Sequence, residues 1–150
     1  AFHYNRLNGI FADKLPDGKK PEDVIGAGNP AVKALFGSLD EDGKGVRGRV
    51  MLSDLFLNER SRKIFNHVAI DRFTGGALDG ALFSEEAVST DGFTIAADVD
   101  ESAFAADPSI QKAFECALRD IATGMLPLGG STMRGHSCFS GTIMKNGEAL

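Results

Sequence analysis

The sequence predicts an α/β fold in which antiparallel strands pack against helices. Three observations carry this prediction. Apolar side chains recur at helical spacing over residues 107–124, they alternate with polar ones over residues 46–56 and 92–99, and residues 67–86 have the signals of an extended hairpin. The chain of 150 residues is long enough for one domain with a real core.

The first third of the chain predicts two short helices joined by a loop. Residues 2–15 carry apolar side chains at helical spacing and precede a Pro-Asp-Gly turn, so we expect the end of an amphipathic helix there. Residues 19–28 are polar and glycine-rich, which predicts a loop. Residues 30–36 predict a short helix that packs its apolar side chains inward.

A turn cluster at residues 39–45 precedes the first predicted strand. It resembles the start of a calcium-binding loop, but the spacing fails after Gly43 and no acidic residue closes it. Over residues 46–56 most even positions are apolar, whereas Arg47 and Arg49 project to the other face, which predicts a half-buried strand. Two adjacent arginines suit contact with phosphate, and two solvated arginines are the alternative.

Residues 67–86 predict a hairpin with too few apolar side chains to belong to a core. Apolar and polar or small side chains alternate from Val68 to Asp71, and two turn signals follow, Thr-Gly-Gly at residues 74–76 and Asp-Gly at residues 79–80. A surface hairpin without a binding role is the alternative.

The next predicted elements are a second strand and the longest helix. Residues 92–99 place apolar side chains on one face, and an acidic connection follows. Asp107 suits the N-cap, Pro108 suits the first helical position, and Gly124 ends the helix. The apolar spacing between these limits predicts a helix with one buried face.

Residues 126–141, with the sequence LPLGGSTMRGHSCFSG, join that helix to a last predicted strand at residues 138–144. Glycine permits positive φ and close approach to a ligand, and hydroxyl and guanidinium groups donate to phosphate. The glycines are Gly129, Gly130, Gly135 and Gly141, and the donors are Ser131, Thr132, Arg134 and His136. The stretch is a candidate phosphate-binding loop, with plain turns as the alternative.

The net charge of −5 argues against a generic nucleic-acid coat but leaves room for a local basic groove. Acidic residues gather at positions 40–42 and 98–101. Basic residues gather at Arg47, Arg49, Arg60, Arg62 and Lys63, interrupted by Asp54 and Glu59. This segregation is expected if one face binds a polyanion, and two solvated surfaces explain it equally well.

The remaining composition predicts a cytoplasmic protein. No apolar run is long enough to span a bilayer, and no signal peptide is visible. Cys116 and Cys138 fit no zinc pattern, so we expect free thiols in a reducing compartment.

The segment GGSTMRGHSCF at residues 129–139 resembles the C-terminal glycine-rich loop of the RAMP superfamily, the repeat-associated proteins of CRISPR effector complexes. More narrowly, it resembles the backbone subunit of type III complexes. Three further segments resemble the family in the expected order, NPAVKALFGS at 29–38, GRVMLSDLF at 48–56 and HVAIDRFTGGALDGALFSEE at 67–86. Together they cover most of the chain from Asn29 onward.

The resemblance implies an RRM-like (ferredoxin-like) antiparallel sheet with packed helices and a protruding thumb hairpin at residues 67–86. A first strand and its helix would precede Ala1, so residues 1–150 are expected to form a single RAMP-like domain that lacks its N-terminal part. Many relatives carry zinc-binding cysteines before the Leu-Phe-Gly segment. Residues 26–29 read GAGN at that place, so no zinc site is expected.

The resemblance also implies partners, which are a CRISPR guide RNA, a target RNA, and homologous backbone subunits or domains. The family's thumb reaches over a neighbouring subunit and wedges between bases of the guide–target duplex. The expected thumb contacts are Phe73, Thr74, Leu82 and Phe83. The expected contacts to the RNA backbone are Arg47, Arg49, Gly129, Gly130, Ser131, Thr132, Arg134 and Gly135.

Catalysis is left open by the sequence. Type III backbone subunits commonly cut target RNA with an aspartate near the start of the domain, in a part that this chain does not contain. By analogy with single-chain relatives, Asp71 and Asp79 are candidates that would hold Mg²⁺, although turn and ion-pair roles explain both. The alternatives are a metal-independent guide-processing endoribonuclease that uses His136, with His3 and His67 as further histidines, and a non-catalytic assembly scaffold.

Overall fold

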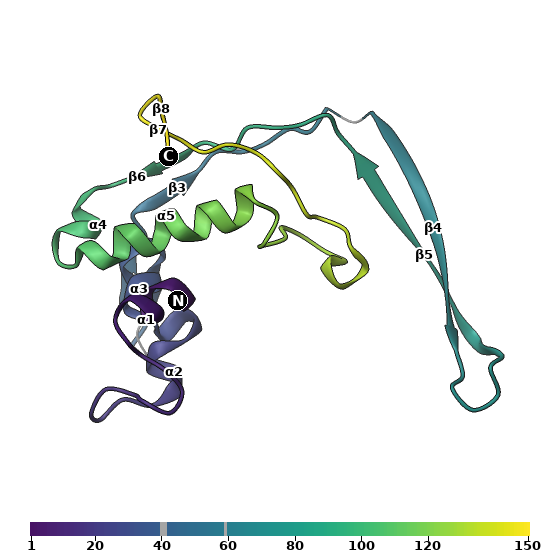
Figure 1. Ribbon diagram of the computed structural model, residues 1–150, viewed down its shortest axis with the longest axis horizontal. Helices are drawn as coiled ribbons and strands as arrows, with labels where there is room; N and C mark the ends of the chain where they lie inside the picture. The colour runs from purple at the N-terminus through teal and green to yellow at the C-terminus, as the bar shows by residue number, and fades with distance from the viewer. Residues whose placement is uncertain (40–41, 59) are drawn as a thin grey trace. The chain divides into compact units, whose positions relative to one another are not determined.

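The computed structural model describes residues 1–39, 42–58 and 60–150 (Figure 1). Asp40, Glu41 and Glu59, which belong to the charge pattern above, lie outside the described residues. The chain divides into a helical unit, Ala1–Met51 with Asp98–Leu150, and a hairpin unit, Leu52–Ala97. Helices and antiparallel strand pairs both occur, which confirms the predicted α/β class.

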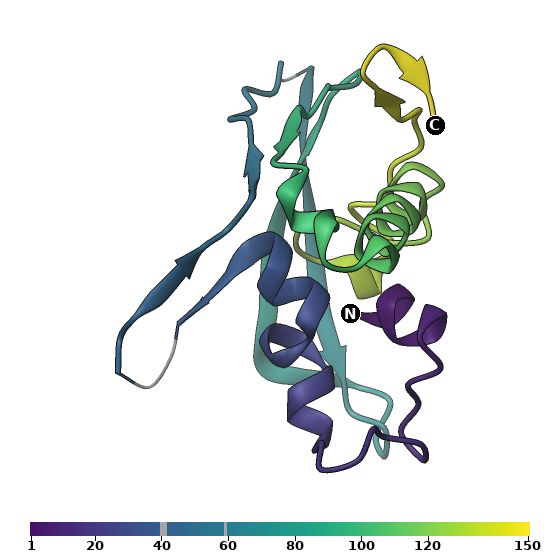
Figure 2. The ribbon, with the colours of Figure 1, turned by 90° about the vertical axis from the view of Figure 1, so that its left-hand side faces the viewer.

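The core of the helical unit lies between short helices and one long one. The helices are α1 (Phe2–Leu7), α2 (Pro21–Val24), α3 (Pro30–Phe36), α4 (Ser102–Ala105) and α5 (Pro108–Ala122), with single 3₁₀ turns η1 (Gly26–Gly28) and η2 (Thr132–Arg134). Both views show α1 lying beside α5 (Figures 1 and 2). The buried core residues are Tyr4, Ala31, Leu35, Ala103, Ile110 and Ala113.

The long helix α5 has the limits that its sequence predicts. The Asp107 Oδ1 accepts a hydrogen bond from the Ser109 N–H at 2.9 Å, and Pro108 occupies the first helical position. Gly124 follows the helix with φ of 76°, a conformation that favours glycine. The apolar face of α5 buries Ile110 and Ala113, so its predicted orientation is confirmed.

One buried amide ties the start of the chain to α3. Asn29 is 0 % exposed, and its Oδ1 accepts from the Ala31 N–H at 3.0 Å, which caps α3. Its Nδ2 donates to the Asn5 Oδ1 at 2.8 Å and to the Val24 carbonyl at 2.7 Å. Because all three groups would be costly to bury unpaired, this residue holds α1, α2 and α3 in one arrangement.

The N-terminal prediction is wrong in detail. The first helix ends at Leu7 rather than Leu15, because Gly9 takes a φ of 65° and the chain turns back through a Phe11–Lys14 bridge. The expected loop at residues 19–28 contains α2, which starts at Pro21 and is capped by Asp23 Oδ2 accepting from the backbone N–H of the preceding Lys20. The acidic connection before Asp107 likewise contains α4.

The strand expected over residues 46–56 is broken in two. Strand β2 (Gly45–Arg47) pairs with β1 (Gly37–Leu39), and β3 (Val50–Leu52) pairs with β6 (Ala97–Val99). Gly48 lies at the break, and a Cβ there would lie 2.9 Å from the Phe36 carbonyl carbon and oxygen, so the two backbones approach closely at this point. The half-buried pattern is also wrong, because Val46, Leu52 and Phe56 are exposed. The second predicted strand shrinks from residues 92–99 to β6.

The hairpin unit confirms the predicted hairpin and lengthens it. Strand β4 (Ser61–Ile70) pairs antiparallel with β5 (Ala77–Ser89), and Figure 1 shows the two as a long ribbon. The register shifts between Val68↔Leu82 and Ile70↔Ala77, so residues 78–81 bulge from β5 opposite Ala69.

The C-terminal strand lies later than predicted. Residues 138–144 do not form one strand; instead β7 (Met144–Lys145) pairs with β8 (Glu148–Ala149). Asn146 and Gly147 connect them with φ of 51° and 90°, as a two-residue hairpin turn requires. The Lys145 Nζ lies 2.8 Å from the Glu115 Oε1, which joins this hairpin to α5.

Candidate nucleic-acid interface

The glycine-rich loop, residues 126–141, leaves the C-terminal end of α5 and is tied back to it (Figure 1). The Leu126 N–H donates to the Asp120 carbonyl at 2.9 Å, and the Gly141 N–H donates to the Ala122 carbonyl at 2.8 Å. Within the loop, the Leu128 N–H donates to the Ser137 carbonyl at 2.9 Å. The first two bonds attach both ends of the loop to the helix. The third brings the two sides of the loop together near the helix.

The backbone of the loop uses positive φ at four positions, only two of which were expected. Gly129 and Gly135 have φ of 110° and 81°. Ser131 and Ser137 also take positive φ, at 55° and 67°, whereas Gly130 and Gly141 do not use the positive φ that glycine permits. Between Ser131 and Gly135 the chain makes the single turn η2.

Several donors of the loop are left without a protein acceptor. Within the described residues, no acceptor is bonded to the backbone N–H groups of Gly129, Gly130, Thr132 and Met133. The Arg134 side chain is exposed in the same turn. Successive N–H groups beside a left-handed residue form an anion-binding concavity, and an arginine adds charge and a forked donor. The C-terminal end of α5 carries partial negative charge and therefore repels anions. Any attraction for an anion must come from the N–H groups and the arginine of the loop itself.

A charged contact joins the hairpin that follows the loop to α5. Glu115 on α5 accepts from the Lys145 Nζ at 2.8 Å and from the Gln111 Nε2 at 2.9 Å. The hydrogen bond from Lys145, followed by that from Gln111, holds the pKa of the Glu115 carboxyl below its usual value. The loop is therefore anchored before and after its glycines.

Arg49 and Arg47 do not join the loop. The Arg49 Nη1 donates to the Ser102 carbonyl at 3.3 Å, beside α4 and therefore near the N-terminal end of α5. The loop leaves the opposite end of this 15-residue helix, which spans about 22 Å at 1.5 Å per residue. Arg47 is exposed and lies 3.8 Å from the Met51 Sδ. Arg49 thus lies near the end of α5 opposite the loop, and both arginines are exposed.

A family model for the RAMP superfamily matches residues 2–140 of the chain. The chain belongs to the RAMP superfamily. Membership confirms the resemblance to the superfamily and points to a CRISPR-associated RNA-binding function. Among curated proteins, none shows significant similarity to this chain. No helix in the described parts of this RAMP protein is long and apolar enough to cross a membrane.

The tip of the RAMP hairpin is built by its own polar side chains. The Asp71 Oδ1 accepts from the Phe73 N–H at 2.7 Å, and the Thr74 Oγ1 accepts from the Gly76 N–H at 3.3 Å. The Gly75 N–H donates to the Asp71 carbonyl at 2.9 Å. Asp71 and Thr74 therefore shape the turn, and the turn presents the Phe73 side chain, which is 99 % exposed.

The two candidate carboxylates occupy different settings. One oxygen of Asp71 already accepts a turn hydrogen bond, whereas Asp79 is exposed in the bulge of β5 beside Gly80, whose φ is 72°. Across residues 1–39, 42–58 and 60–150, no three His, Cys, Asp or Glu side chains gather as a metal site. The second turn signal of the sequence, Asp79-Gly80, thus marks a bulge and not the hairpin turn.

Leu82 and Phe83 point to opposite faces of the hairpin, because successive residues of a strand alternate. The register pairs His67 with Phe83 and places Phe65 on the same face. No aromatic pair on a strand face was predicted from the sequence, so the group formed by Phe65, His67 and Phe83 was missed. Its signal was the spacing of Phe65 and His67, which becomes informative only when the cross-strand register is known.

His3 and two arginines of the hairpin unit have acidic partners. The His3 Nε2 lies 2.6 Å from the Asp120 Oδ2 at the base of the loop, and His136 is half-buried within the loop. In the hairpin unit, Arg60 pairs with Asp91, and the Arg62 Nη1 lies 3.2 Å from the Glu86 Oε1. Because these arginines are paired with acids, the segregated charges of the sequence do not form an uncompensated basic face there.

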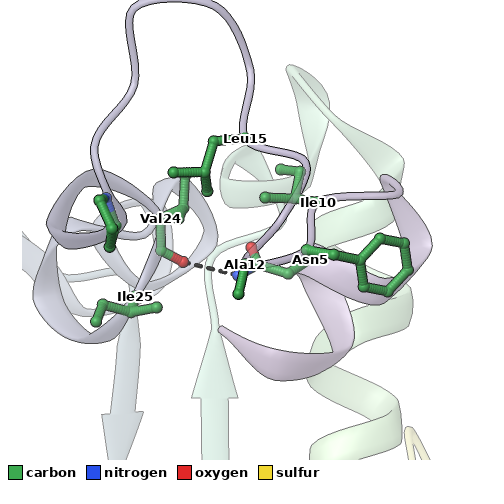
Figure 3. Close-up of a pocket in the computed structure, with 8 residues that line it drawn as sticks. Asn5, Ile10, Ala12, Leu15, Val24 and Ile25 are labelled. Atoms are coloured by element: carbon green, nitrogen blue, oxygen red, sulfur yellow. Dashed lines mark hydrogen bonds between the residues drawn. The ribbon is translucent and has the colours of Figure 1, made fainter.

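The helical unit also contains an open pocket of about 140 Å³ near α1 and α2 (Figure 3). Its lining residues are Asn5, Ile10, Phe11, Ala12, Leu15, Pro21, Val24 and Ile25. Its polar group, Asn5, donates to the Val24 carbonyl at 2.8 Å and accepts from Asn29. The lining is apolar and its amide is satisfied, so the pocket lacks the convergent polar groups of a ligand site.

Proposed function

We propose that this RAMP protein is a guide-RNA-binding backbone component of a type III CRISPR RNA-targeting complex. The observation that carries the proposal is the glycine-rich loop, which is anchored at both ends and offers backbone N–H donors beside Arg134. Such donors recognise the ribose-phosphate chain and not the base sequence, as a protein that carries variable guides needs.

Within the loop, Arg134 would supply the charge, while Gly129, Gly130, Thr132 and Met133 would supply N–H donors to phosphate oxygens. Ser131 and Gly135 would hold the backbone in the left-handed conformations that flank η2. Arg47 and Arg49 would make a separate phosphate contact, and Arg49 has N–H donors besides the one that reaches the Ser102 carbonyl.

The test is the salt dependence of RNA binding. Arg134→Ala should weaken binding of single-stranded RNA and lower the slope of log affinity against log salt by about 0.7 to 1, because one phosphate contact is lost. Lys33→Ala is the matched control, because it removes one exposed cation from α3, away from the loop. An unchanged slope for Arg134→Ala, or an equal loss in both variants, would remove the loop from the proposal.

Assembly with homologous backbone subunits and engagement of target RNA complete the proposal. Native complexes purified with this protein should contain short RNA of stepped lengths. Phe73→Ala should leave guide binding unchanged and alter target engagement, because Phe73 lies at the hairpin tip. Purified complexes that contain no RNA would contradict the backbone role.

Target-RNA cleavage is a separable part of this proposal, with Asp79 and Asp71 as candidates. The described residues do not build a Mg²⁺ site by themselves, so RNA phosphates would have to provide further ligands. Asp79→Ala should abolish metal-dependent cleavage without changing the hairpin. Asp71→Asn removes the negative charge and keeps an oxygen that can accept from the Phe73 N–H. This variant therefore tests the charge of Asp71 without removing the hydrogen bond that shapes the turn. Cleavage that persists in both variants would exclude these two aspartates, whereas absence of cleavage by the unaltered protein would support a non-catalytic scaffold.

A further inference from the structure

Ser137 joins the two sides of the glycine-rich loop through both its backbone and its side chain. The Ser137 carbonyl accepts a hydrogen bond from the Leu128 N–H at 2.9 Å. The Ser137 Oγ donates to the Gly130 carbonyl at 3.0 Å. A Cβ at Gly129 would lie 3.3 Å from the same Oγ, so the two sides of the loop lie close together there. Ser137 therefore holds the segment from Leu128 to Gly130 on the opposite side of the loop.

The backbone of Ser137 takes a conformation that serine rarely adopts. Its φ is 67°, in the left-handed region that glycine adopts without a steric cost. A glycine at this position would avoid the cost, but it would lack the hydroxyl that reaches the Gly130 carbonyl. Residues held in unfavourable conformations cluster at functional sites. The conformation of Ser137 therefore directs attention to what its hydroxyl does.

The segment that this hydroxyl holds is part of the candidate phosphate site. Gly129 and Gly130 have no side chain to restrict their φ and ψ, so their backbone is the most permissive part of the loop. Their N–H groups are among the loop donors that have no acceptor within the described residues. A donor that is already oriented loses less conformational freedom when it binds a ligand. The hydrogen bond from Ser137 supplies such an orientation to this segment.

We infer that Ser137 is a positioning residue for phosphate binding, because its hydroxyl holds the Gly129–Gly130 backbone in the orientation that presents its N–H groups to an RNA phosphate. The inference rests on the proposed RNA-binding function and adds a residue that acts through the backbone. Arg134 supplies charge, whereas Ser137 is neutral. Loss of the Ser137 hydroxyl should therefore leave the number of released counterions unchanged.

The experiment measures the affinity of the protein for an oligouridine of roughly 12 nucleotides at several salt concentrations. Ser137→Gly and Ser137→Ala both remove the hydroxyl, and each should weaken binding about tenfold, the value of one charge-assisted hydrogen bond. The slope of log affinity against log salt should stay unchanged in both variants, whereas Arg134→Ala should lower it. Ser140→Gly removes the same atoms from an exposed position of the same loop, and this matched control should change neither affinity nor slope.

Urea unfolding separates a positioning role from a merely structural one. Glycine accepts the φ of residue 137 without strain and alanine does not, so Ser137→Gly should unfold at a higher urea concentration than Ser137→Ala. The two variants should nevertheless bind RNA equally weakly, because both lack the hydroxyl. If Ser137→Gly binds like the unaltered protein and only Ser137→Ala binds weakly, affinity follows the backbone conformation, and the inference is overturned.

Other outcomes distinguish this inference from the proposed function. Unchanged affinity in both Ser137 variants would overturn the inference, and so would an equal loss in Ser140→Gly. If Arg134→Ala lowers the salt slope while both Ser137 variants bind like the unaltered protein, the proposed function stands and only the role of Ser137 is excluded. If the unaltered protein does not bind the oligouridine, both proposals fall.

The backbone amide signals of Gly129 and Gly130 provide a second readout. In NMR spectra of the unaltered protein they should shift when saturating oligouridine is added, because their N–H groups would donate to phosphate. In Ser137→Ala the same signals should shift less at saturation, and in Ser140→Gly they should shift as in the unaltered protein. Equal shifts in Ser137→Ala and the unaltered protein would show that the hydroxyl does not orient these donors.

Discussion

The helical unit and the hairpin unit use apolar side chains in opposite ways. In the helical unit, Leu35 and Ile110 are buried between α1, α3 and α5. In the hairpin, Leu82 is 71 % exposed, and both strands carry exposed apolar side chains along their length. Two-stranded hairpins bury too little surface to be stable alone, whereas packed helices provide a core. The comparison teaches that stability resides in the helical unit, while the hairpin presents side chains for binding.

The largest effect should come from the core. Leu35→Ala removes buried methyl groups between α1 and α5, and should lower the free energy of unfolding by about 2 to 5 kcal/mol. Urea unfolding followed by circular dichroism measures it. Leu39→Ala is the control from the same unit, because Leu39 is exposed, and its effect should stay within roughly 0.5 kcal/mol. Similar losses in the two variants would mean that the core is misassigned.

The next effect should come from the buried amide. Asn29→Ala removes the cap of α3 and leaves the Val24 carbonyl and the Asn5 Oδ1 with fewer donors, so we expect a loss of roughly 1 to 3 kcal/mol. Asn29→Asp keeps an acceptor for the Ala31 N–H and loses the donations. If Asn29→Ala unfolds at the same urea concentration as the unaltered protein, the amide does not organise these helices.

A smaller effect should come from the cap of α5, and it should depend on pH. Hydrogen bonds from Ser109, and then one from Tyr4, hold the folded-state pKa of Asp107 below its ordinary value of 3.8. Because the folded-state pKa is lowered, the ionised cap stabilises the fold above pH 3.8, and this contribution is lost as the pH falls through the lower folded-state pKa.

Asp107→Ala should therefore cost about 1 kcal/mol at neutral pH, and the difference from the unaltered protein should shrink below pH 3.8. Thermal unfolding measured across that range checks the prediction. Asp98→Ala, in strand β6 before α4, is the control without a cap role. A difference that stays constant down to the lowest pH would exclude the ionised cap.

Elements defined by local signals could be predicted from the sequence. Asp107, Pro108 and Gly124 fix the ends of α5 by their own backbone preferences, and Asn29 with Pro30 starts α3 in the same way. The break at Gly48 could not be predicted, because it depends on contact with the distant Phe36 backbone. Positive φ at Ser131 and Ser137 could not be predicted either, since glycines stood nearby as the easier choice.

The rings that share one face of the hairpin, Phe65, His67 and Phe83, show the limit most clearly. If the register of Ile70↔Ala77 continued along the strands, Phe65 would oppose Leu82, and Phe83 would share a face with Ile64. The bulge at residues 78–81 adds three residues to β5, and because strands alternate with period two, an odd insertion exchanges its faces. The sequence contains two turn signals and does not say which is the turn. The candidate loop was found from composition, whereas this face required the register.

The smallest effect on stability should come from the hairpin. Leu82→Ala removes an exposed side chain from the hairpin, so the free energy of unfolding should change by less than about 0.5 kcal/mol. The same urea titration that measures Leu35→Ala checks it. The two substitutions remove the same atoms, so burial is the main cause of their difference. A loss for Leu82→Ala as large as that for Leu35→Ala would show that this face is covered in the folded protein. A small loss would show that side chains of the hairpin can change for binding with little effect on the free energy of unfolding, which depends on the helices.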